Sequence, residues 1–284
     1  MTGFVNFLKP PKMSSAQAVS IIKKISGAKK CGHMGTLDPF ACGVLPIALG
    51  RATKLFDYLI DREKKYRAIF KFGIETDTFD LDGYLINTDN KRVTLDQINQ
   101  ILPEFIGIIS QLPPKFSAKR INGQRAYELA RSGQDVELKP SIVKIYDITV
   151  QEIGGNEFVF DISCSGGTYI RSICRDIAYK LDTCATMTCL IRQASGIFNI
   201  QDSCSLQELE QDFKIISCQE VLKDYIKCII ENEKNYTLAV NGAYFRAKTF
   251  SESSSNLAFY YNDELIGIGQ KTKENLYKLD VILK

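Results

Sequence analysis

Residues 32–39, Gly-His-Met-Gly-Thr-Leu-Asp-Pro, concentrate more groups able to do chemistry than any other stretch of the chain. They include two glycines, the only histidine, His33, and one aspartate, Asp38. Pro39 disfavours helical backbone at Asp38, and the glycines let a substrate approach the main chain closely. The stretch is suited to presenting one carboxylate at a defined angle. A turn aspartate without a catalytic role fits the same pattern.

Residues 165–171, Ser-Gly-Gly-Thr-Tyr-Ile-Arg, form a second group. The glycine pair stands where a predicted strand meets a predicted helix, and Tyr169 and Arg171 fall in the first helical turn. Main-chain amides at a helix start suit a phosphate, and an arginine there can pair with a carboxylate through two hydrogen bonds. A helix cap followed by an exposed arginine explains the pattern equally well.

Composition narrows the chemistry further. A single histidine excludes two-histidine zinc sites, and any pairing of a nucleophile with a histidine must use His33. The chain lacks the glycine-rich signatures of nucleotide-phosphate loops. Carboxylates, tyrosines, lysines and arginines are therefore the groups left to carry the chemistry.

Charge is unevenly distributed behind a net value of +3. Residues 1–72 hold 13 basic and 4 acidic side chains, and residues 110–134 hold 5 and 1. Segments 73–109 and 201–235 are acidic. If the two basic blocks meet in the fold, they form a patch suited to a polyanion, although solvated helix faces are an equally ordinary reading.

Cysteine usage and hydropathy place the chain in a cellular context. Nine cysteines occur without a C-x-x-C pair, and no secretory signal pattern is present. Reduced thiols in a cytoplasmic protein are the expectation. Because no apolar run approaches the roughly 18–20 residues that cross a bilayer, we expect no membrane association.

The predicted elements alternate without a regular strand-helix-strand rhythm, which favours an α+β fold. A capping box at Ser14 to Gln17 predicts a helix that ends at Gly27. Much of 28–50, with four glycines and two prolines, is predicted as loop. Further strands are expected at 3–8, 66–72, 115–121, 142–150, 158–164 and 187–191, and further helices at 51–60, 94–106, 127–133, 168–181 and from 205.

The pattern changes near residues 232–240. Beyond this point short β-like runs at 257–261, 265–269 and 279–283 are separated by polar turns. We therefore expect one domain over residues 1–235 and a small β-rich segment over residues 236–284.

In combination, these motifs resemble the TruB family of bacterial tRNA pseudouridine-55 synthases over the first 200 residues, and more weakly beyond. Any one motif is weak, but several in the expected order are specific. The motifs are Lys9-Pro10 with 13–15, 32–39, 43–54, Lys65-Tyr66, 73–83, 113–118, 123–131, 167–171 and 190–196.

The resemblance implies a cofactor-free, metal-free isomerisation of a uridine in the T loop of tRNA. The target base is flipped from the RNA stack, its glycosidic bond is cleaved, and the uracil turns and rejoins the ribose through carbon 5. The implied fold is an α+β pseudouridine synthase fold with a mixed, mainly antiparallel sheet flanked by helices. The C-terminal segment would be a truncated PUA-like unit, and the protein a monomer without an obligate protein partner.

The resemblance also assigns catalytic residues. Asp38 aligns with the essential aspartate, which acts as nucleophile or initiates cleavage. Arg171 would pair with Asp38 and orient it. Tyr66 would stack on the target uracil and is a candidate base for the carbon 5 proton, although the ordinary tyrosine pKa of about 10 suits that second role poorly.

RNA-binding residues follow in the same way. His33 would take the place of the flipped base in the RNA stack, while Tyr169 and Leu190 would line the pocket. Lys9 and Lys54 belong to the basic residues expected to meet RNA phosphates.

The chain departs from the family pattern at four positions without losing a named chemical group, namely Lys12, Met34, Phe116 and Ile191. Two other readings stay open. One is an RNA chaperone that uses the same flipping surface, and the other is a guide-RNA-dependent pseudouridine synthase of the archaeal type.

Overall fold

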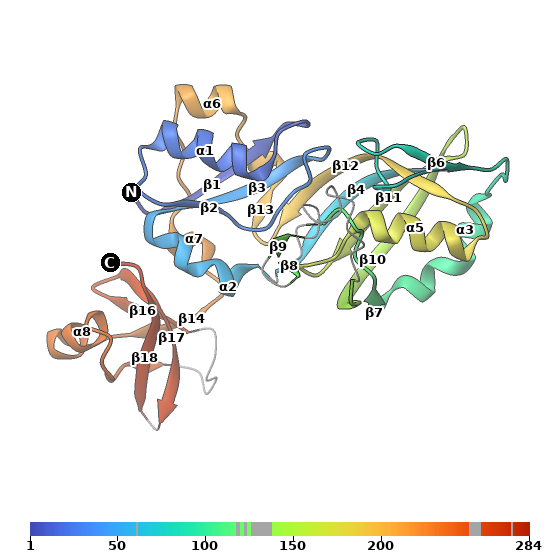
Figure 1. The fold of residues 1–284 in the computed structure, drawn as a ribbon. Coiled ribbons are helices and arrows are strands. Elements are labelled where there is room, and N and C mark those ends of the chain that lie inside the picture. Colours follow the sequence, from blue (N-terminus) through green and yellow to red (C-terminus); the bar gives the residue numbers. More distant parts are fainter. Residues whose placement is uncertain (61, 118–119, 122–123, 126–137, 250–256, 274) are drawn as a thin grey trace.

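A large mixed sheet forms the centre of the computed structural model, and a smaller sheet forms its C-terminal part (Figure 1). The structure describes residues 1–284 except 61, 118–119, 122–123, 126–137, 250–256 and 274. Within these residues the large sheet has nine strands in the order β1-β3-β12-β4-β11-β10-β7, with β2 on β3 and β13 on β12. The strands are β1 (Gly3–Lys9), β2 (Cys31–His33), β3 (Cys42–Leu49), β4 (Lys64–Phe72), β7 (Gly107–Gln111), β10 (Ser141–Gly154), β11 (Glu157–Cys164), β12 (Ala185–Ser195) and β13 (Phe198–Asn199).

Antiparallel pairing dominates the large sheet, and β3 with β12 is its parallel pair. Helices accompany the sheet, so the predicted α+β fold with a mixed, mainly antiparallel sheet is confirmed. The helices are α1 (Ser15–Ser26), α2 (Phe56–Leu59), α3 (Leu95–Ile101), α5 (Ile170–Lys180), α6 (Leu206–Gln211), α7 (Cys218–Val221) and α8 (Glu233–Val240), with 3-10 turns η1 (Gly50–Leu55), η2 (Leu102–Phe105) and η3 (Ile200–Asp202).

Helix α1 begins and ends where the sequence predicts. The Ser14 hydroxyl accepts a hydrogen bond from the Gln17 amide, and the Gln17 side chain accepts one from the Ser14 amide. Gly27 ends the helix with a left-handed φ of 64°. Local capping therefore fixes the helix that precedes the 32–39 segment.

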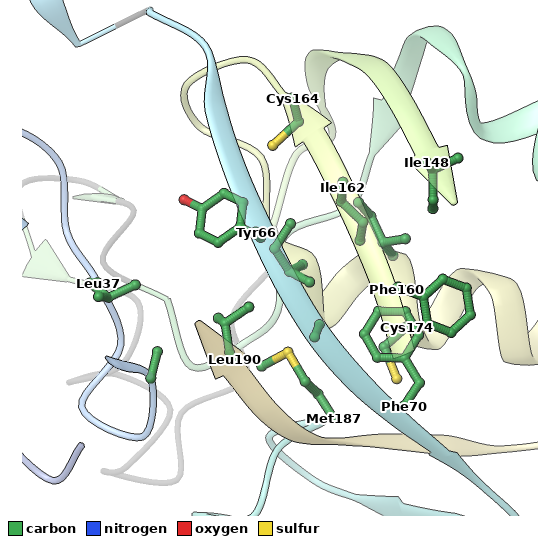
Figure 2. Packing of buried hydrophobic residues seen from close by; sticks show 14 of the residues in the cluster. Leu37, Tyr66, Phe70, Ile148, Phe160, Ile162, Cys164, Cys174, Met187 and Leu190 are labelled. Atoms are coloured by element: carbon green, nitrogen blue, oxygen red, sulfur yellow. The ribbon is translucent and has the colours of Figure 1, made fainter. Parts of the chain in front are cut away.

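Aromatic packing between β4 and β11 lies at the centre of the main core, which α5 also joins. The rings of Phe70 and Phe160 stack with centroids 4.3 Å apart, and Met187 of β12 packs beside them (Figure 2). Tyr66 and Leu190 belong to the same cluster at its end nearest Leu37 (Figure 2). Tyr66 and Leu190 are thus held in place by the packed core.

The prediction that much of 28–50 is loop is wrong for 31–33 and 42–49, where β2 and β3 lie, and holds for 34–41. Residues 43–49 of β3 are all buried between neighbouring strands, so they form a continuous apolar run without alternation. Gly43 has a φ of 108°, and a Cβ there would lie 2.3 Å from the Arg192 carbonyl oxygen. The glycine that suggests a loop is the residue that permits the parallel contact of β3 with β12.

Smaller differences occur elsewhere. Thr168 is not the cap of α5, which begins after Tyr169, because the Thr168 hydroxyl donates to the Ser165 carbonyl instead. The strand predicted at 115–121 is described only as β8 (Arg120–Ile121), paired with β9 (Gln124–Arg125). The helix predicted through 127–133 lies outside the described residues.

The C-terminal sheet has the order β15-β14-β16-β17-β18 in the described chain. Its strands are β14 (Ile226–Ile229), β15 (Lys248–Thr249), β16 (Leu257–Tyr261), β17 (Glu264–Lys273) and β18 (Leu276–Ile282). Strand β14 belongs to this sheet although it precedes the predicted boundary at 235/236, and that boundary stays a prediction. No helix among the described residues is long and apolar enough to span a membrane.

The two sheets share a hydrophobic cluster. Phe4 and Val44 of the large sheet lie in one buried group with Ala258, Ile268 and Val281 of the C-terminal sheet. The C-terminal part is therefore packed onto the large sheet by apolar contact.

Candidate active site

Asp38 and Arg171 meet in the structure. The carboxylate Oδ2 of Asp38 lies 2.9 Å from Nη2 of Arg171, which occupies the first turn of α5. The Arg171 side chain is only 5% exposed, whereas that of Asp38 is 32% exposed. The buried guanidinium of Arg171 thus holds the partly exposed carboxylate of Asp38 at the surface.

A second carboxylate shares the same guanidinium. Oδ2 of Asp80 lies 3.5 Å from Nη1 of Arg171, and both side chains are 5% exposed. The Thr78 hydroxyl donates to Asp80 at 2.6 Å, and the Asp82 amide donates at 3.0 Å. Burial raises the pKa of Asp80, while Arg171 and the Thr78 hydrogen bond oppose that rise.

Asp80 is missing from the sequence-based site. It belongs to the strip between β5 (Ile74–Thr76) and β6 (Leu85–Thr88), which has several acidic residues of similar appearance. The only sequence signal for Asp80 was its place in the 73–83 motif, which resembles the family. Nothing in the spacing separates Asp80 from its acidic neighbours.

Arg192 of β12 fixes the start of the Asp38 loop. Its side chain is fully buried and donates hydrogen bonds to the carbonyls of Val44 at 2.7 Å, Thr36 at 3.2 Å and Gly35 at 3.3 Å. A buried guanidinium is tolerated because carbonyl oxygens replace its lost hydration. Sequence reasoning missed this residue, since its partners lie about 150 positions away in the chain.

Two further side chains hold the rest of the loop. The Ser15 hydroxyl donates to the Leu37 carbonyl and accepts from the Leu37 amide, both at 2.9 Å. The Lys9 ammonium donates to the Pro39 carbonyl at 3.3 Å. The main chain on both sides of Asp38 is thus fixed by hydrogen bonds, while its carboxylate reaches the surface.

A cavity of about 400 Å³ opens beside this ion pair. Its size falls in the range of small-ligand sites, and its wall combines charged groups with an apolar surface. The predicted residues that line it are Asp38, Tyr66, Tyr169, Arg171 and Leu190. The glycine pair of the 165–171 group lines it too, so the two groups singled out in the sequence form one site.

The two tyrosines of the cavity wall are a buried Tyr66 and a half-buried Tyr169. Tyr66 is 6% exposed, and burial raises the pKa of its hydroxyl, opposed by the Arg192 guanidinium. Burial also raises the pKa of Tyr169, opposed by a hydrogen bond with Ser117. The Gln111 side chain holds the Tyr169 main chain by accepting from its amide at 2.8 Å and donating to its carbonyl at 3.1 Å.

The other predicted RNA-binding residues are distributed around the loop. His33 is half-buried at the end of β2, opposite Ile47, and is not part of the described cavity wall. Lys54 is exposed on η1. Both lie outside the cavity itself.

Lys9 is not at the surface. It is fully buried, and besides Pro39 its ammonium donates to the carbonyls of Met13 at 2.6 Å and Pro10 at 2.8 Å. Burial lowers its pKa to about 8. In this position the ammonium is committed to three carbonyls, so it fixes the loop and is not a phosphate contact.

Exposed cations of the first basic block gather around α1, β2 and η1. They are Lys23, Lys24, Lys29, Lys30, Arg51 and Lys54. Contacts of α1 and η1 with β2 place these residues along the strand that leads into the Asp38 loop. Lys119 and Arg131 of the second block lie outside the described residues.

Comparisons with known proteins identify the family. The model described as "TruB family pseudouridylate synthase (N terminal domain)" matches residues 23–170, which is more than half of the chain. The chain belongs to the TruB family. The model described as "tRNA pseudouridylate synthase B C-terminal domain" matches residues 171–231.

Curated TruB relatives are similar over their whole length. The tRNA pseudouridine synthase B of Clostridium tetani is 40% identical over 282 residues, covering 96% of this chain and 97% of the relative. That of Clostridium novyi is 40% identical over 290 residues and covers both chains completely.

Solved structures show the same architecture as this TruB chain. The structure of an H/ACA RNP bound to a substrate RNA containing 2′-deoxyuridine gives a TM-score of 0.75 at 26% identity. A Cbf5-Nop10-Gar1 complex gives 0.77 at 27% identity. Each match covers 99% of this chain and 85% of the other.

Proposed function

We propose that this TruB-family chain is a tRNA pseudouridine synthase that isomerises uridine 55 in the T loop. The observation that carries the proposal is the Asp38 carboxylate, held 2.9 Å from Arg171 at the wall of a base-sized cavity. Full-length identity of 40% to bacterial tRNA pseudouridine synthases B supports tRNA as the substrate.

The proposed reaction uses groups already in place. The target uridine is flipped into the cavity and stacks on the Tyr66 ring, and Leu190 closes the apolar side. Asp38 initiates cleavage of the bond between the base N1 and the ribose C1′, and uracil leaves with the bonding electron pair. Retained in the cavity, the uracil turns and its C5 bonds to C1′. The C5 proton passes to water, and N1 takes up one proton in exchange.

Each neighbour of Asp38 has a part in this scheme. Arg171 orients the carboxylate through the contact at 2.9 Å. Tyr66 supplies a stacking surface, since the raised pKa of its phenol disfavours a phenolate that would take up the C5 proton. His33 fills the gap that the flipped base leaves in the RNA, and exposed cations such as Lys54 meet phosphates. The enzyme acts as a cytoplasmic monomer without a cofactor.

The test is direct. Purified protein is incubated with an unmodified T stem-loop RNA, without a guide RNA or any second protein, and pseudouridine is mapped by carbodiimide treatment and primer extension. We expect a stop at position 55 with the natural chain and with Asp96→Asn, an exposed control on α3, and none with Asp38→Ala. Near-normal product from Asp38→Ala would overturn the proposal.

The same experiment separates the alternative readings. A guide-dependent enzyme would give no product in this mixture. A chaperone without catalysis would bind the RNA and leave position 55 unmodified.

A further inference from the structure

A second hollow lies where the segment from α2 to β4, the turn between β12 and β13, and the residues before β14 come together. It has a volume of about 530 Å³ and shares no lining residue with the Asp38 cavity. Its wall combines two tyrosines, one arginine and two carboxylates with the turn between β12 and β13. These residues are Tyr58, Arg62, Glu63, Gly196, Ile197, Asp224 and Tyr225.

The hollow is held open by specific contacts. The Arg62 guanidinium lies over the Tyr225 ring, 5.9 Å from its centroid. Gly196 makes room for this arginine, because a Cβ there would lie 2.9 Å from Arg62 Cδ. The Tyr225 hydroxyl donates to the Tyr58 carbonyl at 3.3 Å, and the Gly196 amide donates to the Glu63 carbonyl at 2.8 Å.

Two charges in this wall have no ion pair with another described residue. Among the ion pairs of the described residues, none involves Arg62 or Asp224. The guanidinium rests on an aromatic face, and Asp224 is exposed. Both charges are therefore available to a ligand that carries an anion and a hydrogen-bond donor.

The hollow and the Asp38 cavity are neighbours along one segment. Ile60, Lys64 and Tyr66 line the cavity, whereas Tyr58 and Arg62 line the hollow. Even fully extended, the chain from Arg62 to Tyr66 spans at most about 14 Å. An RNA whose uridine occupies the cavity thus has neighbouring nucleotides within reach of the hollow.

Resting on the proposed function, we propose that the hollow binds a second nucleotide of the same RNA, one whose base carries an exocyclic amino group. Tyrosine faces stack on any base, and arginine pairs with phosphate. The exposed Asp224 carboxylate accepts hydrogen bonds and donates none when ionised, so it recognises the amino group of adenine, cytosine or guanine. Oε1 of Glu63 already accepts from Ser163 at 2.6 Å, so Glu63 has only its other oxygen to offer. Uracil has no amino group and is disfavoured.

Stem-loop RNAs with one abasic loop position each locate the nucleotide. Binding is measured for the natural chain, for Arg62→Met, which keeps the stem over Tyr225, and for Arg92→Met, an exposed control near α3. We expect one abasic position to weaken binding of the natural chain and the control about tenfold, as for loss of a stacked base. For Arg62→Met the same abasic change lowers RNA affinity distinctly less, because the contact between Arg62 and that nucleotide is already absent.

Base analogues test the amino group. At the position so found, a base without its amino group, such as inosine for guanosine, weakens binding, and Asp224→Asn reduces this discrimination. If every abasic change costs Arg62→Met as much as it costs the natural chain, the inference is wrong. Pseudouridine formation by the natural chain is measured separately. Loss of the second-nucleotide proposal therefore leaves product formation intact, whereas loss of the proposed function removes the product.

Discussion

The loop that carries Asp38 and the turn that carries Asp80 both present a carboxylate to Arg171, yet they treat it differently. Asp80 is almost fully enclosed, and Thr78 and Asp82 occupy its oxygens in addition to Arg171. Asp38 remains about a third exposed, and its loop is fixed through main-chain atoms held by Arg192, Ser15 and Lys9.

This difference separates two tasks. The Asp80 turn sets the position of Arg171, and its carboxylate is too enclosed to meet a substrate. The Asp38 loop is rigid in its backbone and open at its carboxylate. A group that reacts must keep an accessible lone pair. The protein therefore fixes the main chain around Asp38 and leaves its carboxylate exposed to the cavity.

The largest effect is expected from Arg171→Lys, which removes the link between loop and turn. An ammonium cannot contact both carboxylates and the two carbonyls that the guanidinium reaches. We expect kcat/KM to fall by about 100- to 1,000-fold, measured by release of tritium from C5-labelled RNA. Arg67→Lys, in an exposed ion pair with Asp161, is the control, and an equal loss there would contradict this reading.

Arg192→Met tests the rigid side of the loop. It leaves one buried and two partly buried carbonyls without their donor, while the thioether only partly fills the space. We expect the free energy of unfolding in urea to fall by about 3 kcal/mol. The surviving folded enzyme should also show a lower kcat, because Gly35 and Thr36 are released. Unchanged stability would show that the guanidinium does not hold the loop.

Asp80→Asn is expected to lower kcat about tenfold with little change in KM, because Arg171 loses one of its two counter-charges. Burial raises the pKa of Asp80, so on acidification it is neutralised before an ordinary aspartate. The natural enzyme should lose activity across that step, and the variant should lack it. Superimposable profiles of kcat against pH would remove Asp80 from the mechanism.

The smallest effect concerns Lys9. Its pKa is about 8 in the folded protein because of burial, below the ordinary lysine value of 10.5. Between these values the unfolded chain keeps a proton that the folded chain has released, so this group makes stability rise with pH. Urea unfolding from pH 7.5 to 10 should show a steeper rise for the natural chain than for Lys9→Met. Parallel curves would place the Lys9 ammonium in solvent.

Local signals predicted much of this molecule. The capping boxes at Ser14 and Thr94 mark true helix starts, and alternation found the strand that ends at Cys164, because each pattern depends on neighbours in the chain. Strand β3 was not predicted, because burial on both faces removes the alternation of polar and apolar residues. Gly43 and Pro46 are also residue types that usually indicate a loop.

Long-range contacts set the limit for the site. Asp38, Tyr66 and Arg171 were named from motif resemblance, and the structure brings them to one cavity. The burial of Lys9 and Arg192 depends on carbonyls brought close only by the fold, and no pattern of spacing announces it. One of the basic residues assigned to a surface patch, Lys9, is therefore buried.

The cluster shared by the two sheets has a consequence for synthesis on the ribosome. During synthesis Phe4 emerges long before Val281 and Leu283, which belong to the same buried group. This part of the core cannot close until Val281 and Leu283 have been made. Strands β1 and β3 therefore keep part of their apolar surface exposed until β18 has emerged.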